Sequence, residues 1–183
     1  GEATVTSSLT FTSANWDTAK TVTVTGVDDD IIDGTQTSTI TVSIIDGISD
    51  NAFDAVADQT VSVTTTDDDV AGFTIAETEG STGVDESGST DIFTIVLDTQ
   101  PSSDVVLSIT SSDTGEATVE SLIQFTSANW DTPQNVTVTG VDDGIIDGTQ
   151  TSTITVTIVD AITDDDFDAV ADQTVSVTTT DDD

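Results

Sequence analysis

The chain has 183 residues and a formal net charge of -35 at pH 7, with 36 acidic side chains against a single basic residue, Lys20, and neither His nor Cys. One cation cannot replace the counterions of a phosphate backbone or an anionic lipid surface, so the composition excludes nucleic acid and membrane surfaces as partners. No apolar run approaches the roughly 18 residues of a membrane-spanning helix, which also argues against membrane insertion. Without His or Cys, any bound metal must be a hard cation held by oxygen atoms.

Short alternating runs of β-branched and polar residues predict strands throughout the chain, and no segment has the periodicity of a helix. Between residues 70 and 183 the expected strands are Gly72–Ala76, Ile92–Leu97, Asp104–Thr110, Leu122–Thr126, Gln134–Thr139, Thr151–Ile158 and Gln173–Thr180, with Glu116–Val119 as a possible short addition. About seven strands in this length predict an all-β fold made of tandem immunoglobulin-like antiparallel β-sandwiches.

The sequence repeats itself at a constant offset of 114, with 55 of the first 69 residues identical to their counterparts in residues 115–183. We therefore interpret residues 70–183 as one complete repeat, and residues 1–69 as the C-terminal part of a preceding repeat whose opening strands are missing. The missing strands are expected from upstream sequence. Strand donation by an identical neighbouring chain is the alternative.

One aromatic residue recurs between two predicted strands, as Trp16 and Trp130. An exposed tryptophan could contact a sugar or a protein partner. We favour the simpler interpretation, a plug that closes one end of the hydrophobic core, because most isolated aromatic residues serve packing.

Two acidic motifs recur once per repeat, each at the end of a predicted strand. The first is Val-Asp-Asp-x-Ile-Ile-Asp-Gly-Thr-Gln, at 27–36 and 141–150, and the second is Thr-Thr-Thr-Asp-Asp-Asp, at 64–69 and 178–183. Runs of Asp can simply be solvated strand ends. Their joint recurrence instead favours calcium, which binds six to eight oxygens and relieves repulsion between clustered carboxylates.

The repeat resembles the Calx-beta domain, a seven-stranded calcium-binding sandwich of sodium/calcium exchangers, integrin beta-4 and many bacterial surface proteins. The resemblance covers residues 70–183 and rests on the Val-Asp-Asp-x-Ile-Ile-Asp segment, the terminal Asp-Asp-Asp, and the Asp-Asp-Asp-Val-Ala-Gly junction at 67–72. For the complete repeat the resemblance implies these Ca²⁺ ligands: Glu86, Asp113, Asp142, Asp143, the carbonyl of Ile145, Asp147, Asp181, Asp182 and Asp183.

For the first copy the same resemblance implies Asp28, Asp29, Ile31, Asp33, Asp67, Asp68 and Asp69. The sequence departs from the exchanger pattern, with Gln36 and Gln150 where an acid is typical. The acidic segments 46–58 and 160–172 are expected to hold either a further ion or a short helical turn around Phe53 and Phe167.

These features lead us to expect a calcium-rigidified structural or extender repeat of a large extracellular surface protein, such as an adhesin stalk or a fibre. Near-identical repeats suit a length-giving role, and millimolar calcium outside cells makes weak sites sufficient. Its partners would be calcium and adjacent repeats. The alternatives are a calcium-sensing regulatory module and a glycan- or ligand-binding module, whereas an enzyme using paired carboxylates is not expected.

Overall fold

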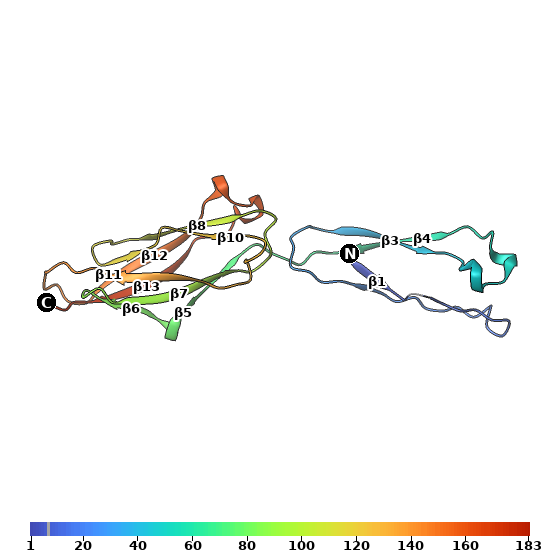
Figure 1. Cartoon of the computed structure of the whole chain (residues 1–183), viewed down its shortest axis with the longest axis horizontal. Coiled ribbons are helices and arrows are strands. Elements are labelled where there is room, and N and C mark those ends of the chain that lie inside the picture. Colours follow the sequence, from blue (N-terminus) through green and yellow to red (C-terminus); the bar gives the residue numbers. More distant parts are fainter. Residues whose placement is uncertain (7) are drawn as a thin grey trace. The chain divides into compact units, whose positions relative to one another are not determined.

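The computed structural model describes residues 1–6 and 8–183, which form two compact units (Figure 1). The first unit comprises Gly1–Asp29 and Asp33–Asp68, and the second comprises Asp30–Ile32 and Asp69–Asp183. Strands and a few short 3-10 helices make up both units, which confirms the all-β prediction. Within the described residues, no helix is both long enough and apolar enough to cross a membrane.

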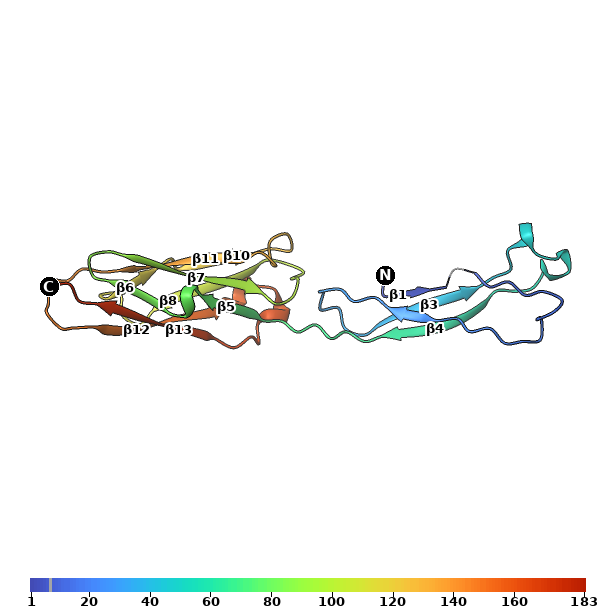
Figure 2. The same cartoon turned by 90° about the horizontal axis from the view of Figure 1, so that it is seen from below.

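The second unit is a sandwich of two sheets, whose layers are visible in Figures 1 and 2. The four-stranded sheet has the order β5 (Phe73–Glu77), β7 (Thr90–Leu97), β11 (Gln134–Gly140) and β9 (Ala117–Val119). The five-stranded sheet has the order β10 (Leu122–Phe125), β8 (Val105–Ser111), β12 (Gln150–Ile158), β13 (Gln173–Thr180) and β6 (Thr82–Asp85). All seven expected strands are present, and the possible short addition is β9.

The strand β6 was not predicted, and it changes the expected topology. It pairs in parallel with β13, from Val177 opposite Thr82 to Thr180 opposite Asp85, whereas every other strand pair is antiparallel in the part of the chain that the structure describes. The segment is only four residues long and has one large apolar residue, Val84, so it lacks an alternating pattern. Its parallel pairing makes β6 and β13 end at the same edge of the sheet.

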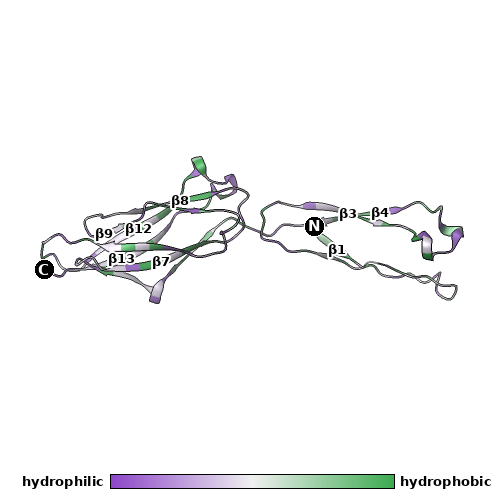
Figure 3. Cartoon of the chain, in the orientation of Figure 1, coloured by the Kyte–Doolittle hydropathy of each residue, from purple (hydrophilic) through white to green (hydrophobic). Residues whose placement is uncertain are grey.

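Successive side chains of each strand point to opposite faces of its sheet, and those on the inner faces form the core of the second unit. In β13, Val175 and Val177 are buried while the intervening Ser176 is exposed, and β7 buries Phe93, Ile95 and Leu97 in the same way. Hydrophobic residues along these strands appear green in Figure 3. In β13, Thr174 and Thr178 are exposed, whereas Thr179 is fully buried.

The first unit contains two two-stranded sheets, β1 (Ala3–Val5) with β2 (Val24–Gly26) and β3 (Gln36–Val42) with β4 (Gln59–Thr65). The registers match those of the second unit: Ala3 lies opposite Gly26 as Ala117 lies opposite Gly140. The near-identical sequences therefore form the same local pairings in both copies.

Burial, in contrast, differs greatly between the copies. Phe125 and Val175 are 0% and 2% exposed, whereas their counterparts Phe11 and Val61 are 51% and 56% exposed. No residue is buried in the described part of the first copy, residues 1–6 and 8–69. In the second unit, residues 70–114 provide β5 to β8, which cover these side chains. The same local sequence is thus buried in the second unit and exposed among the described residues of the first copy.

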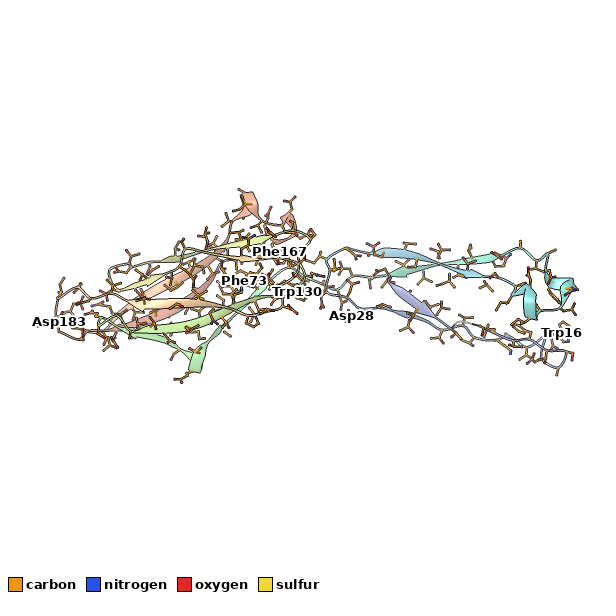
Figure 4. The ribbon with its side chains drawn as sticks, viewed as in Figure 1. Trp16, Asp28, Phe73, Trp130, Phe167 and Asp183 are labelled. Carbon is orange, nitrogen blue, oxygen red and sulfur yellow. The ribbon has the colours of Figure 1, made fainter. Side chains whose placement is uncertain are left out.

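Trp130 is partly buried and packs against the core of the second unit, which confirms the plug interpretation for this residue. It lies with Phe73 and Phe167 towards the end of this unit opposite Asp183 (Figure 4). Trp16 differs, because 73% of its surface is exposed.

Short 3-10 helices occupy the acidic segments, as η1 (Asp46–Ile48), η2 (Asn51–Phe53), η4 (Asp160–Ile162) and η5 (Asp165–Phe167), while η3 (Thr78–Gly80) follows β5. The prediction of a helical turn around Phe53 and Phe167 is therefore confirmed. Asp164, only 4% exposed, accepts hydrogen bonds from the Ser102 hydroxyl and the Ser103 N–H at 2.8 and 2.7 Å. Protein donors thus satisfy this buried carboxylate.

Candidate metal centre

Strand ends bring the predicted ligands of the second unit to one end of the sandwich. Glu86 follows β6, Asp113 follows β8, and Asp181 follows β13, while residues 141–149 connect β11 to β12. The register places Thr180 beside Asp85 and Thr179 beside Gln150, so these segments leave the sheet at the same edge. Asp183 is at this end in Figure 4.

Glu86 is the most unusual group at this end, because it is a carboxylate with only 1% of its surface exposed. Its backbone N–H donates to the carbonyl of Thr180 at 3.1 Å, which holds the residue against the end of β13. Its Oε2 atom is buried and has no hydrogen-bond partner. Burial, followed by the negative charges of Asp181 and Glu116, raises the pKa of Glu86. An ionised carboxylate in this position is costly unless a cation compensates it.

Glu86, Asp181 and Asp183 each have a carboxylate oxygen near those of the other two, and the three oxygens lie within 4.8 Å of one another. Oxygens bound to one calcium ion at about 2.3–2.6 Å lie at most about 5.2 Å apart, so separations within 4.8 Å are compatible with a shared ion. Asp181 is half-buried and Asp183 is exposed. Hydrogen bonds from the backbone of Asp183 and Gly148 lower the pKa of Asp181, which keeps it ionised.

The segment between β11 and β12 folds back onto Asp181. The Gly148 N–H donates to Asp181 Oδ2 at 2.6 Å, and the Ile145 N–H donates to Asp143 Oδ1 at 2.8 Å. Gly144 and Gly148 have φ angles of 75° and 74°, a left-handed conformation that glycine adopts without strain. Asp142, Asp143 and Asp147 are exposed in this segment. Burial is the largest cause of the raised pKa values of Glu86 and Asp183. The charges of Asp143 and Asp147 also raise the pKa of Glu86, and the charge of Asp142 also raises the pKa of Asp183.

The remaining predicted residues stand outside the group of three oxygens. Asp113 is exposed in the turn after β8, where its Oδ1 accepts the Gly115 N–H at 2.9 Å. Asp182 is exposed, and Ile145 is 58% exposed. Ligand roles for these residues stay predictions.

Sequence reasoning missed one acidic residue at this end, Glu116. It is only 8% exposed, its Oε2 is buried without a hydrogen-bond partner, and burial followed by Asp147 and Asp113 raises its pKa. A signal was available in the repeat: Glu2 and Glu116 are the only Glu pair at equivalent positions in both copies.

The first copy repeats the loop geometry without the buried carboxylate. The N–H groups of Asp33 and Gly34 donate to Asp67 Oδ2 at 3.0 and 2.6 Å, as Gly148 does to Asp181. Asp28, Asp29 and Asp68 are exposed, Asp69 is half-buried, and Ile31 belongs to the segment Asp30–Ile32 that groups with the second unit. Among described residues 1–6 and 8–69, no three carboxylates converge as Glu86, Asp181 and Asp183 do.

No protein-family model matches the sequence, and no curated protein matches it either. Among solved structures, the apo form of the Calx CBD1 domain aligns with 61% of this chain and 98% of its own, at 14% identity and a TM-score of 0.43. Domains 4 and 5 of the S-layer protein SbsC align with 89% of this chain and 84% of theirs, at 18% identity and a TM-score of 0.42. The Escherichia coli chaperone DraB aligns with 60% of this chain and 55% of its own, at 8% identity and a TM-score of 0.42. At these values none of them assigns the chain to a family.

Proposed function

We propose that the second unit binds calcium at the end of its sandwich and that the protein is a calcium-rigidified extender repeat of an extracellular surface protein. The observation that carries the proposal is the buried Glu86 carboxylate. Its Oε2 atom is unpartnered, and one of its two oxygens lies within 4.8 Å of carboxylate oxygens of Asp181 and Asp183. The donor set is made only of oxygen, and the chain has neither His nor Cys, which favours a hard cation. Calcium also tolerates the irregular geometry of a site assembled from several loops.

Calcium would act here by removing repulsion between chain segments that are far apart in sequence. Glu86 follows β6, Asp181 and Asp183 follow β13, and the loop between β11 and β12 donates the Gly148 N–H to Asp181. One ion at the three oxygens would therefore hold the ends of these strands together. In the ion-free protein burial raises the pKa of Glu86, and the negative charge of Asp181 raises it further. The second unit would then be more stable with calcium bound, and the strand ends at this end of the sandwich would be more mobile without calcium.

The extender role follows from the repeat and from the short connection between copies. Asp67, Asp68 and Asp69 are followed after three residues by Phe73, where β5 begins. Such a short connection leaves little freedom once its acidic residues are bound to an ion. Repeats that are nearly identical over 69 residues supply length without distinguishing one copy from another.

Calcium titration of the full chain tests the proposal, with binding followed by calorimetry and the melting temperature measured in calcium and in chelator. We expect binding at millimolar calcium or below and a higher melting temperature, and a weaker effect of magnesium, which requires stricter geometry and retains its water. The variant Glu86→Gln should bind less calcium, and Glu120→Gln, an exposed residue of the same charge outside the group, should behave as the parent does. An absence of binding at millimolar calcium would refute the proposal.

The extender role needs a separate measurement. Val70 is 74% exposed, so a protease that cuts after small apolar residues should cleave this connection in chelator. Calcium should protect it, and Asp67→Asn should remove the protection while leaving the calcium-dependent melting of the second unit unchanged. Cleavage at equal rates with and without calcium would contradict a rigidified connection.

A further inference from the structure

The first copy exposes an apolar face whose counterpart is covered in the second unit. Val42 is 53% exposed, whereas Val156 at the equivalent position is fully buried. Of the eleven hydrophobic residues that are buried within 115–183, all but one keep their identity in the first copy, and the exception is the conservative pair Leu9 and Ile123. A segment that fits one of these faces therefore meets nearly the same side chains on the other.

Three strands of the first copy also have an edge without a neighbouring strand. Among residues 1–6 and 8–69, β2, β3 and β4 each pair with one strand, whereas their counterparts β11, β12 and β13 have a second neighbour in β7, β8 and β6. Residues 8–11 form no strand, although the equivalent β10 is a strand that pairs only with β8. The backbone groups at such edges can pair with a further strand.

Gly26 leaves room for the backbone of another strand. In the second unit, a Cβ atom on the equivalent Gly140 would lie 2.0 Å from the carbonyl oxygen of Asp85, so this glycine allows β6 to approach β11. On Gly26 the same Cβ atom would meet only Thr65 Cγ2, at 3.6 Å. The first copy therefore has space at Gly26 for a strand equivalent to β6.

Residues 70–114 are the segment that matches these features. In the second unit they supply β6, β7 and β8, which pair with the edges that are open in the first copy. The Leu97 N–H of this segment donates to the carbonyl of Trp130 at 3.1 Å, and Trp130 packs against the core. A segment of this kind on the first copy would meet the exposed Trp16 in the same way.

The apolar area of this face is large enough for a specific interface. Six of its side chains have exposed fractions of 36–56%, whereas their counterparts are at most 9% exposed: Leu9, Phe11, Val22, Val24, Val42 and Val61. Covering these six would bury about 500 Å² on the first copy, since side chains of this kind each present one to two hundred Å² when free. Equal burial on the docked strands gives about 1,000 Å², the area from which specific interfaces begin.

We propose that the first copy is an acceptor for the segment 70–114 of a second copy of this chain. The segment would add strands equivalent to β6, β7 and β8 to the open edges of β4, β2 and β3. Residues 1–183 contain two nearly identical acceptor faces and one such segment, so exchange between chains leaves the contacts almost unchanged and costs little. The face that the segment leaves is itself an acceptor, so assembly can continue from chain to chain.

A synthetic peptide of residues 70–114 tests whether the face accepts this segment. The peptide is added to the full chain in chelator, so that the result does not depend on calcium. Binding is followed by calorimetry and by the fluorescence of Trp16 in a Trp130→Phe background. We expect one peptide per chain and a blue shift of the Trp16 emission, because the ring becomes covered. An absence of binding at millimolar peptide, or binding without a change at Trp16, would overturn the proposal.

Point variants test the arrangement of the docked strands. Gly26→Ala should weaken peptide binding at least about tenfold, because its Cβ atom would meet the backbone of the strand equivalent to β6. Gly47→Ala is the matched control, since its Cβ atom has nothing within 4 Å and the second copy has Ala161 at this position. In the peptide, Ile95→Asp should abolish binding, whereas Thr90→Asp, at an exposed position of the same strand, should not. Equal affinities for Gly26→Ala and Gly47→Ala would refute this arrangement.

Sedimentation of the full chain tests whether a second copy is the donor. The chain is unfolded and then refolded in chelator and high salt, which screens the repulsion between acidic molecules. At about millimolar chain, which matches the effective concentration of a segment on a short tether, we expect dimers and longer assemblies beside the monomer. Dilute refolding should give monomers, and Gly26→Ala should reduce assembly. A chain that binds the peptide but stays monomeric after concentrated refolding would show that a second copy is not the donor.

Discussion

Replacing Gly140 by alanine tests how closely the site is tied to the packing of the two sheets. Gly140 ends β11, and its N–H donates to the Ser89 carbonyl at 3.0 Å. A Cβ atom at this position would lie 2.0 Å from the carbonyl oxygen and 2.8 Å from the carbonyl carbon of Asp85. These are backbone atoms, so the clash cannot be relieved by a side-chain rotation. Because Asp85 precedes Glu86, a shift of the Asp85 backbone would also move the Glu86 carboxylate of the candidate site.

The counterpart in the first copy, Gly26, provides a matched control. Its added Cβ would meet only Thr65 Cγ2, at 3.6 Å, which is ordinary van der Waals contact. We expect Gly140→Ala to lower the free energy of unfolding of the second unit by about 1–3 kcal/mol, as overpacking does elsewhere. Gly26→Ala should instead be neutral or stabilising by about 0.5–1 kcal/mol, because alanine loses less backbone entropy than glycine on folding.

Scanning calorimetry of the full chain in chelator measures both effects, and calcium titration measures the consequence for the site. For a unit of this size, the expected loss in Gly140→Ala corresponds to a fall in melting temperature of about 4–15 °C. Its calcium affinity should fall as well, whereas that of Gly26→Ala should not. Equal stability and affinity in the two variants would refute the reasoning, because it would mean that β6 does not lie against the end of β11.

Two further predictions use the same chain. Phe125→Ala should destabilise the second unit by about 3–5 kcal/mol because this side chain is fully buried. Phe11→Ala should lower the free energy of unfolding by less than about 1 kcal/mol, because the ring is half exposed and has Lys20 Nζ 5.1 Å from its centre. If calorimetry shows equal losses for the two variants, Phe11 is buried in solution. The melting temperature in chelator should rise as the pH falls from 7 towards 5, because the raised pKa values of Glu86, Glu116 and Asp183 make the folded protein bind more protons than the unfolded chain. Below the ordinary carboxyl pKa of about 4 it should fall again, as Asp91, Asp164 and Asp181, whose pKa values are lowered, become protonated. In calcium the melting temperature should not rise between pH 7 and pH 5, because protons then compete with the ion. A melting temperature in chelator that falls steadily from pH 7 would contradict this account.

The sequence alone determined the repeat, the positions of the acidic loops and the strands of the second unit other than β6. Alternation of Val and Ile with Thr is a local pattern, so β12 and β13 could be predicted from their own residues. The repeat also predicted equal local structure, and β3 and β4 do pair in the register of β12 and β13. Composition also restricted the expected metal ligands to oxygen atoms, because the chain has neither His nor Cys.

Tertiary structure decided which of these residues are buried, and burial is what distinguishes a site from a solvated loop. Nothing local marks β6 as a strand, so its parallel pairing with β13, which brings Glu86 to Asp181, could not be predicted. The repeat marks Glu116 as a glutamate shared by both copies, but only the tertiary structure shows that its side chain is buried with an unpartnered oxygen. The same holds for Phe11 and Phe125, which share their local sequence and differ only in what covers them. Local sequence sets backbone pairing, whereas the cost of desolvating a side chain depends on strands that are distant in the chain.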